Sequence, residues 1–478
     1  LFFFENATQY SFVELPYKEK MKYILHDFSM ENSHKEKRIL FYPNEIKEII
    51  IRRYLLLWQG VEILMNNGKS YFFNFFHSNH LQTFFSKIEK YFKITVITNL
   101  RENFAEQGFQ KKWNNNTISS YEFLLAINKF ASRSFIEPTQ YPVFPWVLLE
   151  YKQMNSNNNT LHYRDFKYPV ACQTEDKREE CIQRYKYNID NEFKSHLGTH
   201  YSTSSFIYYY LMRCNPYTHS LIKLQGDNFE NTNRMFFSVD ETLGILDSSP
   251  DCRELIQEFF SKIDFMINLN CNAFGKRRNG ELVDDLLFDN RASLSVYIDF
   301  IMRHRNLLDS SIVKTKLPHW INFIFGQNQL SGGEKACNIF QKETYEEKVN
   351  LEANIIELEK EKQDEAMIVK GTQDLITTIT SFGMTPYKLL EKALVYEGNE
   401  AVDAIDDFPE LLELKDNEKK LLQKECCYFS FDNKYFYILN KKKSTVEIEI
   451  LPTKDMKVGK GKKIKDDHFQ IYSLNGVK

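Results

Sequence analysis

The stretch of the chain that decides its fold is Tyr141-Pro142-Val143-Phe144-Pro145-Trp146-Val147-Leu148-Leu149-Glu150-Tyr151. Each proline fixes the backbone φ angle and removes a backbone donor, so neither a regular helix nor a central strand can run through the stretch. The other side chains are mostly large and apolar, and burying each one stabilises the fold by about 1.5–3 kcal/mol. An extended thread cannot satisfy its own backbone polar groups, so other segments must surround it. The sequence therefore predicts a buried, irregular thread.

A second short signature, Gly198-Thr199-His200-Tyr201-Ser202, follows the thread. Residues 118–151 resemble the opening of a BEACH domain, and the second signature resembles that domain's middle motif. Further matches follow in the family's order at residues 224–226, 253–260, 319–326 and 382–386. The resemblance predicts a mostly helical BEACH domain over 118–390 with an irregular extended core. Its predicted structural core motif consists of Tyr141, Pro142, Phe144, Pro145, Trp146, Gly198, Thr199, His200 and Tyr201.

The first 93 residues predict a separate, strand-rich module. Residues 46–51 and 54–57 are apolar and β-branched, as strands are, and an Asn-Gly turn at 66–68 joins 61–65 to 71–75 as a hairpin. A helix over 78–91 closes the module. Strands with one C-terminal helix resemble a pleckstrin-homology (PH) fold, and residues 46–75 resemble the PH-like module that precedes BEACH domains. We therefore predict an α+β multidomain protein in which a PH-like β-barrel or sandwich docks on the BEACH domain.

The remaining segments are assigned by pattern. Residues 94–117 are expected to be a linker on the surface, anchored by Trp113, and a Ser-x-x-Glu capping box begins a helix at Ser119. Residues 155–192 are polar and turn-rich, and a charged helix is expected over 343–370. Further helices are predicted over 204–213, 229–239, 252–260, 295–308 and 318–325.

After residue 390 the pattern changes. A helix and an acidic linker are expected over 389–414, then strands at 426–431, 434–439 and 445–450. In the family that this chain resembles, a WD-repeat propeller follows the BEACH domain. A propeller blade takes about 40–45 residues. We therefore predict that residues 391–478 are a linker and a partial WD-repeat β region.

The composition of the chain limits the partners and the cellular compartment that we expect for it. The chain has 478 residues, 42% of them hydrophobic and 27% charged, and a net charge of −3, which gives no reason to expect nucleic acid. Its first residue is Leu1, so we expect a piece of a longer protein. No apolar run reaches the ~18 residues of a membrane-spanning helix. Eight cysteines without a C-x-x-C pair suit a reducing compartment. We expect a cytoplasmic, peripherally membrane-associated protein without metal or cofactor.

Several stretches resemble the sequence motifs of catalytic or metal sites. Residues 330–334 read Leu-Ser-Gly-Gly-Glu, as in ATP-binding cassettes, but the nearest phosphate-loop candidate, at 68–70, lies in a predicted hairpin turn and not before a helix. His196 and His200 have metal-ligand spacing, but Gly198 between them argues against a helix. Arg164 and Asp165 are expected to pair with each other. No catalytic residue is predicted, and an unrecognised hydrolase using His200 or Asp165 is the least favoured alternative.

The resemblance implies a scaffold that binds proteins, as peptide segments or adaptors, at membranes. It implies roles in vesicle trafficking, lysosome-related organelles and autophagy. We predict a partner groove between the two modules, with Arg52, Arg53 and Tyr54 near it. Arg52 and Arg53 have an alternative, which is pairing with Glu48 or Glu62 inside the module. The second functional alternative is a phosphoinositide-binding peripheral protein. Its basic cluster would be Lys35, Lys37 and Arg38, although a charged surface loop is the favoured interpretation. The C-terminal basic run could contact anionic lipid or nucleic acid, although a flexible loop is favoured there; it consists of Lys454, Lys457, Lys460, Lys462, Lys463 and Lys465.

Overall fold

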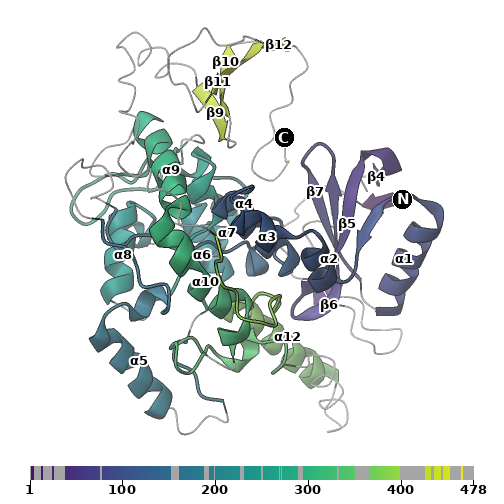
Figure 1. The fold of residues 1–478 in the computed structure, drawn as a ribbon, viewed down its shortest axis with the longest axis horizontal. Coiled ribbons are helices and arrows are strands. Elements are labelled where there is room, and N and C mark those ends of the chain that lie inside the picture. The colour runs from purple at the N-terminus through teal and green to yellow at the C-terminus, as the bar shows by residue number, and fades with distance from the viewer. Residues whose placement is uncertain are drawn as a thin grey trace.

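The computed structural model spans residues 1–478 and shows a strand-rich N-terminal module beside a mostly helical region (Figure 1). The residues that it describes are 38–75, 78–151, 161–187, 193–198, 200–226, 231–248, 251–268, 270, 272–288, 294–330, 333–349 and 365–398, together with strands near both ends. Those strands are β1 (Phe2–Phe4), β2 (Phe12–Val13) and β3 (Ile24–Leu25) at one end and β9 to β12 at the other.

A four-stranded sheet forms the N-terminal module, in the order β7-β6-β5-β8. Its strands are β5 (Ile46–Tyr54), β6 (Leu57–Met65), β7 (Ser70–Asn74) and β8 (Thr95–Ile97). The first three are antiparallel, and β8 runs parallel to β5. The predicted hairpin at 66–68 is confirmed, with Gly68 at φ 83°. The predicted strand over 54–57 is wrong, because β5 continues to Tyr54 and a turn follows directly.

Each face of this sheet packs against a different partner. On one face, Ile49, Val61 and Ile63 pack with Leu81, Phe85 and Ile88 of α1 (Ser78–Tyr91), the predicted closing helix. On the other face, Ile50 belongs to the large apolar core of the helical region. Two small pairs of strands, β1 with β4 (Arg38–Leu40) and β2 with β3, complete the described strands of this end of the chain. The PH-like module is thus docked on the second region through its sheet, as predicted.

The segment 94–117 is more ordered than a surface linker. It contains β8, α2 (Leu100–Glu106) and α3 (Phe109–Asn114). Trp113 has no exposed surface and stacks on Phe123 with ring centroids 4.5 Å apart. The anchoring role predicted for Trp113 is therefore confirmed, whereas the segment itself belongs to the sheet and to the core.

The helical region surrounds its core with short helices and irregular connections. The predicted capping box is present, since Ser119 and Glu122 exchange side-chain and backbone hydrogen bonds at the start of α4. The longer helices in the described part are α4 (Ser120–Phe130), α5 (Glu175–Tyr187), α6 (Ser204–Tyr210), α7 (Tyr217–Leu224), α8 (Val239–Ser248), α9 (Leu294–Asp309), α10 (Ser311–Phe325) and α12 (Glu365–Phe382). Single 3-10 turns are η2 (Pro43–Glu45), η3 (Pro138–Gln140), η5 (Val170–Cys172), η6 (Thr232–Arg234), η7 (Gln257–Phe260), η8 (Asp264–Met266), η9 (Gln327–Gln329) and η10 (Lys342–Thr344).

Some of the helices predicted from the sequence are confirmed, and others are wrong. The helix over 295–308 is confirmed as α9, whereas α10 begins at Ser311 and carries Pro318 inside it. The helix over 229–239 is wrong, since its described part holds only η6 before α8 begins at Val239. The charged helix over 343–370 is wrong at 343–349, which hold the end of η10 and a turn at 346–348, although α12 covers its end from Glu365. Residues 389–398 hold no helix, and the rest of that prediction lies outside the described residues.

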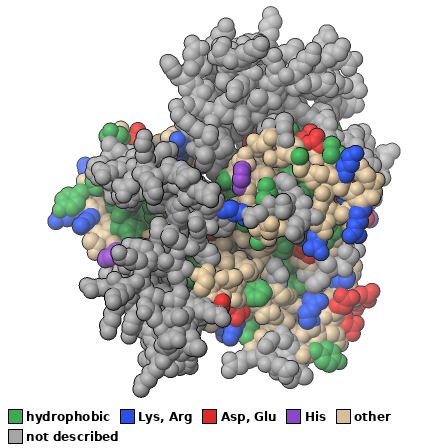
Figure 2. Space-filling model, turned by 180° about the vertical axis from the view of Figure 1, so that it is seen from behind, with side chains coloured by type: hydrophobic (Ala, Val, Ile, Leu, Met, Phe, Trp, Pro, Cys, Tyr) green, Lys and Arg blue, Asp and Glu red, His purple; other side chains and the backbone are tan. Residues whose placement is uncertain are grey.

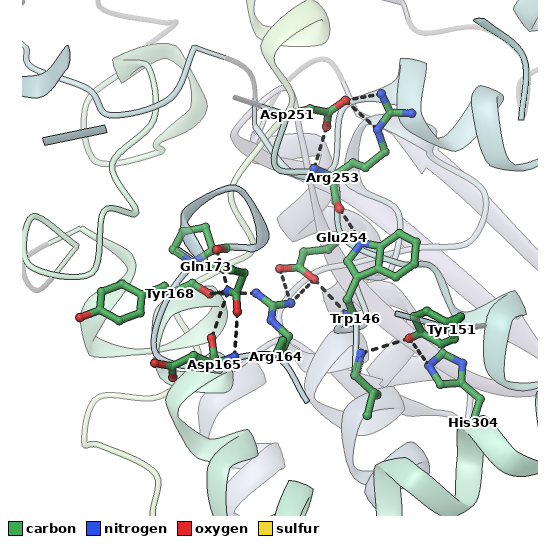
Figure 3. A network of polar contacts seen from close by, with 12 residues as sticks. Trp146, Tyr151, Arg164, Asp165, Tyr168, Gln173, Asp251, Arg253, Glu254 and His304 are labelled. Atoms are coloured by element: carbon green, nitrogen blue, oxygen red, sulfur yellow. Dashed lines mark hydrogen bonds and ion pairs between the residues drawn. The ribbon is translucent and has the colours of Figure 1, made fainter. Parts of the chain in front are cut away.

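The thread at 141–151 is buried and irregular, as predicted. Phe144 and Leu255 exchange two backbone hydrogen bonds of 2.9 Å, so the thread pairs with residues 252–256, which are extended and not helical as predicted. Asn128 of α4 donates to the Val143 carbonyl and accepts from the Val143 N–H at 2.9 and 2.8 Å. The Trp146 indole donates to the Arg253 carbonyl at 2.8 Å, as Figure 3 shows. Neighbouring segments thus satisfy the backbone that the prolines leave unpaired.

The C-terminal sheet is antiparallel, in the order β12-β11-β10-β9. Its strands are β9 (Cys426–Phe431), β10 (Tyr435–Lys442), β11 (Thr445–Pro452) and β12 (Ile464–Asp466). The three predicted strands are present, and β12 is an addition. The WD-repeat assignment of this region stays a prediction.

Candidate functional site

The tip of the β5–β6 hairpin joins the two modules. Tyr54, Leu55, Leu56 and Phe72 of the PH-like module form one apolar cluster with Val349, Ile376, Ile379 and Met384 of the helical region. Leu55 and Leu56 are buried, at 2% and 3% exposed. A hairpin tip usually carries polar turn residues such as Asn-Gly. Two leucines at this tip therefore indicate that it docks into another part of the protein.

The backbone of this tip is strained. Leu55 and Leu56 have φ angles of 47° and 67°, in the left-handed region that bulky side chains rarely adopt. Each such residue costs about 1–3 kcal/mol. Burial of each side chain stabilises by a similar amount, about 1.5–3 kcal/mol. The apolar contacts with the helical region thus hold the turn in its conformation.

Arg53, at the end of β5, makes the central polar contacts of the junction. Its Nη1 donates to Glu346 Oε2 at 2.8 Å, and its Nη2 donates to the Thr385 carbonyl at 2.6 Å. The Trp58 indole of β6 donates to the other carboxylate oxygen of Glu346 at 2.5 Å. Burial lowers the pKa of Arg53, and Glu346 opposes that shift. Both alternatives predicted for Arg53 inside the module, Glu48 and Glu62, are wrong, because its acidic partner is Glu346.

Arg52 pairs with Glu62 inside its own module, which is one of the alternatives predicted for it. Its Nε donates to Glu62 Oε2 at 2.7 Å, and its Nη1 donates to the Lys129 carbonyl of α4. Lys129 in turn pairs with Glu48 at 2.7 Å. Arg52 and Arg53 are each 2% exposed, and Tyr54 is 8% exposed. Direct partner binding by these three residues stays a prediction. Because they are buried, they stabilise the junction between the modules and offer little surface to a partner.

A cleft of about 580 Å³ opens beside these contacts. Arg53 comes to it from the PH-like module and Arg101 from α2, and residues 329–330, 345–348 and 385–388 of the helical region complete its lining. Glu347 and Lys348 are exposed at its surface. The cleft therefore exists only where the modules meet, and both contribute to it.

Tyr387 gives the cleft an aromatic wall. Its ring lies 5.0 Å from the Trp58 ring in an edge-to-face arrangement, and the Arg101 guanidinium lies 4.8 Å from its centroid. Arg101 also donates to the Lys388 carbonyl at 2.7 Å and pairs with Glu391 at 2.9 Å. An aromatic wall flanked by charges of both signs and by backbone carbonyls can bind a peptide segment through stacking and hydrogen bonds.

The residues considered for catalysis do not meet in this cleft. Arg164 pairs with Glu254 at 2.8 Å, with both side chains buried, so its predicted pairing with Asp165 is wrong (Figure 3). His200 has no exposed surface and contacts Ser202 Oγ at 3.2 Å. Burial, with a smaller contribution from Arg133, depresses the pKa of His200, and burial lowers the pKa of His196 to about 4. Each is held as a neutral, buried side chain.

Two other expectations concern ligands and membranes. Lys35 and Lys37 lie outside the described residues, as does the side chain of Arg38, and Thr199 is also outside them. Within the described ranges, no cluster of His, Cys, Asp or Glu could hold a metal ion. The helices described there are also too short or too polar to cross a bilayer.

Sequence reasoning missed Glu346, Trp58 and Tyr387. Arg53 and Glu346 are 293 positions apart, so no local pattern joins them. One signal was available: the run Tyr54-Leu55-Leu56-Leu57 puts four apolar residues where two strands must be joined by a turn. Such a turn is expected to be covered by another part of the protein.

This geometry defines a class of protein: a PH-like module docked through its sheet on a mostly helical domain built around a proline-broken thread. The family model described as Beige/BEACH domain matches residues 111–395, and the one described as PH domain associated with Beige/BEACH matches residues 4–89. The chain therefore belongs to the BEACH-domain family.

Relatives with established names are similar over the same region. Protein SPIRRIG of Arabidopsis thaliana is 32% identical over 382 residues, which is 74% of this chain and 10% of that protein. The human Lysosomal-trafficking regulator is 30% identical over 377 residues, 73% of this chain and 9% of that protein. Beige protein homolog 1 of Saccharomyces cerevisiae is 35% identical over 295 residues, 60% of this chain and 13% of that protein. The chain thus spans about a tenth of the length of these relatives.

Proposed function

We propose that this protein is a non-catalytic scaffold whose junction cleft binds an extended segment of a partner protein at a cytoplasmic membrane surface. The observation that carries this proposal is the cleft of about 580 Å³ to which both modules contribute. Its volume lies within the range of about 300–1,000 Å³ that is typical of ligand sites, which favour boundaries between domains. A fixed boundary gives a partner segment a preorganised surface.

The lining of the cleft suits a peptide with both apolar and charged side chains. Tyr387 offers an aromatic surface, Lys348 a cation and Glu347 an anion. Figure 2 shows side chains of both charge signs interspersed over the described part of one face of the molecule. Mixed charge of this kind fits protein partners more closely than the single-sign field that nucleic acid requires. Contact with anionic lipid through residues 35–38 stays a prediction.

The non-catalytic part of the proposal rests on where the reactive side chains lie. His200, Arg164 and Glu254 are all buried. Arg164 donates to Glu254, and His200 contacts Ser202, so these side chains do not surround an open space. A catalytic acid or base must come within hydrogen-bond reach of a substrate. The trafficking role rests on the family and on the name of the human relative, which is that of a regulator of lysosomal trafficking.

The test is a selection of peptides from a random display library on the immobilised 478-residue chain, followed by binding measurements with the selected peptides. Lys348→Glu and Glu347→Lys change charges that line the cleft. Lys335→Glu is the matched control, because Lys335 is also exposed but does not line the cleft. We expect selected peptides to lose binding to the cleft variants and to keep it for the control. Peptides that bind all variants equally would contradict the proposal.

A further inference from the structure

Three buried cysteines meet beneath helix α5, away from the cleft. Cys172 ends η5, Cys181 lies in the middle of α5, and Cys337 lies in a turn of the segment before η10. The Cys172 thiol donates to Cys181 Sγ across 3.1 Å. Cys172 is also a hydrogen-bond partner of Cys337. All three are free thiols.

Helix α5 contacts the rest of the domain through Cys181, through Tyr185, whose ring stacks on His196 with centroids 4.4 Å apart, and through Arg184, which donates to the His196 carbonyl at 2.9 Å. All its 13 residues are described, and Cys181 is its only buried side chain. The rest of the helix is strongly charged, and Figure 1 shows it at the periphery of the helical region. Elements with few buried apolar contacts open locally at low free energy. Opening of α5 therefore exposes the Cys181 thiol while the core stays folded.

The surroundings of Cys181 favour a reactive thiolate. The Cys172 thiol donates a hydrogen bond to it, and the Arg184 guanidinium adds positive charge, so the pKa of Cys181 is lowered to about 7. The thiolate is the nucleophilic form of cysteine, and cysteines of this kind beside a second thiol are the ones that peroxides oxidise. Cys214, by contrast, is a buried thiol whose pKa is raised by burial.

We propose that Cys172 and Cys181 are a modification site: hydrogen peroxide converts them into a reversible disulfide. The Cys181 thiolate attacks one peroxide oxygen, a sulfur–oxygen bond forms, the oxygen–oxygen bond breaks, and the departing hydroxide takes a proton to become water. The Cys172 sulfur then attacks the sulfenic sulfur of Cys181, a sulfur–sulfur bond forms, and a second water leaves. The two thiols lose two electrons and the peroxide gains them. A small thiol reductant restores both cysteines by thiol–disulfide exchange.

The geometry requires little movement. A disulfide has a sulfur–sulfur length of about 2.05 Å. The two Sγ atoms are 3.1 Å apart when α5 is packed on the domain, so after Cys181 is oxidised and α5 packs again they need only approach each other. Formation of the disulfide would also change the contact between Cys172 and Cys337. This site is independent of the cleft, because none of the three cysteines lines it.

The experiment uses the full chain treated with hydrogen peroxide, blocked with iodoacetamide, and digested with trypsin without reductant. Lys177 and Arg178 lie between the two cysteines, so trypsin separates them and the disulfide joins peptides 168–177 and 179–184. We expect this linked pair to form and to disappear on reduction. Before oxidation, iodoacetamide should modify Cys181 about tenfold faster than Cys214 at neutral pH.

Two variants provide the controls. Cys181→Ser should abolish the linked peptides, and Cys214→Ser should leave them unchanged. Because the wild-type measurement stands without any variant, a folding defect in Cys181→Ser would not remove the test. The proposal is overturned if peroxide links Cys172 to Cys337 instead, if it oxidises Cys214 as fast as Cys181, or if no linked pair forms while other cysteines are oxidised.

Discussion

Arg53 and Glu346, which are 293 positions apart in the chain, form an ion pair of 2.8 Å that joins β5 of the PH-like module to the helical domain. The Arg53 side chain is 2% exposed, whereas that of Glu346 is 32% exposed at the edge of the cleft. One carboxylate thus holds Arg53 and the Trp58 indole together and also borders the cleft proposed to bind partners. The stability of the junction and the shape of the cleft depend on the same contacts.

Glu346→Ala is expected to destabilise the protein. Removing one partner of a fully buried ion pair costs about 3–5 kcal/mol. Since Glu346 is partly exposed, solvent screening reduces the expected loss to about 1–2 kcal/mol. Urea unfolding of the full chain, followed by tryptophan fluorescence, measures it. Glu347→Ala, at the exposed neighbouring position, is the control and should leave the midpoint unchanged. Equal midpoints for both variants would show that the pair does not hold the junction.

The hairpin tip gives a second prediction. Leu55→Ala and Leu56→Ala should each lower the unfolding free energy by about 2–5 kcal/mol, because each removes a side chain buried between the modules. Leu282→Ala is a suitable control, because Leu282 is 58% exposed. Thermal melting of the three variants compares them directly. A melting temperature unchanged from wild type in the tip variants would mean that the strained turn does not depend on docking.

A third prediction concerns the helical domain expressed alone. A fragment of residues 118–398 lacks Ile50, Trp113 and the hairpin tip, all of which pack against it in the full chain. We expect it to aggregate or to melt at a lower temperature than the full chain, since large exposed apolar patches promote association. A fragment that melts as cooperatively and at the same temperature as the chain with both modules would refute the idea of one docked unit.

Trp146→Ala tests the thread. Truncating a large aromatic side chain in a core costs about 3–5 kcal/mol, a large share of a typical domain stability of about 5–15 kcal/mol. The variant also loses the hydrogen bond from the indole to the Arg253 carbonyl. We expect little soluble protein, whereas Tyr187→Ala, at a position 76% exposed, should express normally. Normal solubility and melting of Trp146→Ala would show that the thread is dispensable for folding.

The pH dependence of stability has a predictable component from His304. Burial lowers its pKa in the folded protein to about 3, and an unfolded histidine has a pKa of about 6.5. Between these values the unfolded state binds more protons, so this histidine makes stability fall as pH decreases from about 6.5, by up to about 1.4 kcal/mol per pH unit. The raised pKa values of buried Glu254 and Glu258 act in the opposite sense, so total stability mixes both effects.

The difference between wild type and His304→Gln isolates that component. Urea unfolding at pH 7, 6 and 5 should show a shallower loss of stability with acidification for His304→Gln than for wild type. Leu282→Gln, at a position 58% exposed and without a titratable group, should keep the wild-type slope. Parallel slopes for wild type and His304→Gln would mean that folding does not change the pKa of His304.

Patterns confined to one stretch of sequence predicted the fold well. Two prolines among large apolar residues identified the thread, and apolar spacing identified α9. Helix α5 was missed because its residues are almost all polar and show no apolar periodicity. Residues 252–256 have helix-compatible spacing, yet the Leu255 backbone pairs with Phe144, and only the folded thread supplies that partner. No local pattern could predict the contacts of the cleft, because its lining residues come from five separate parts of the chain.

The most direct test of partner binding in the cleft is photo-crosslinking from the cleft in cells that express this protein. A photoreactive phenylalanine analogue placed at Glu347 should capture a partner protein, and the same analogue at Lys335, exposed but outside the cleft, should not. We expect a crosslinked species specific to position 347. Identical crosslinks from both positions, or none from the cleft when a partner is bound elsewhere on the chain, would contradict it.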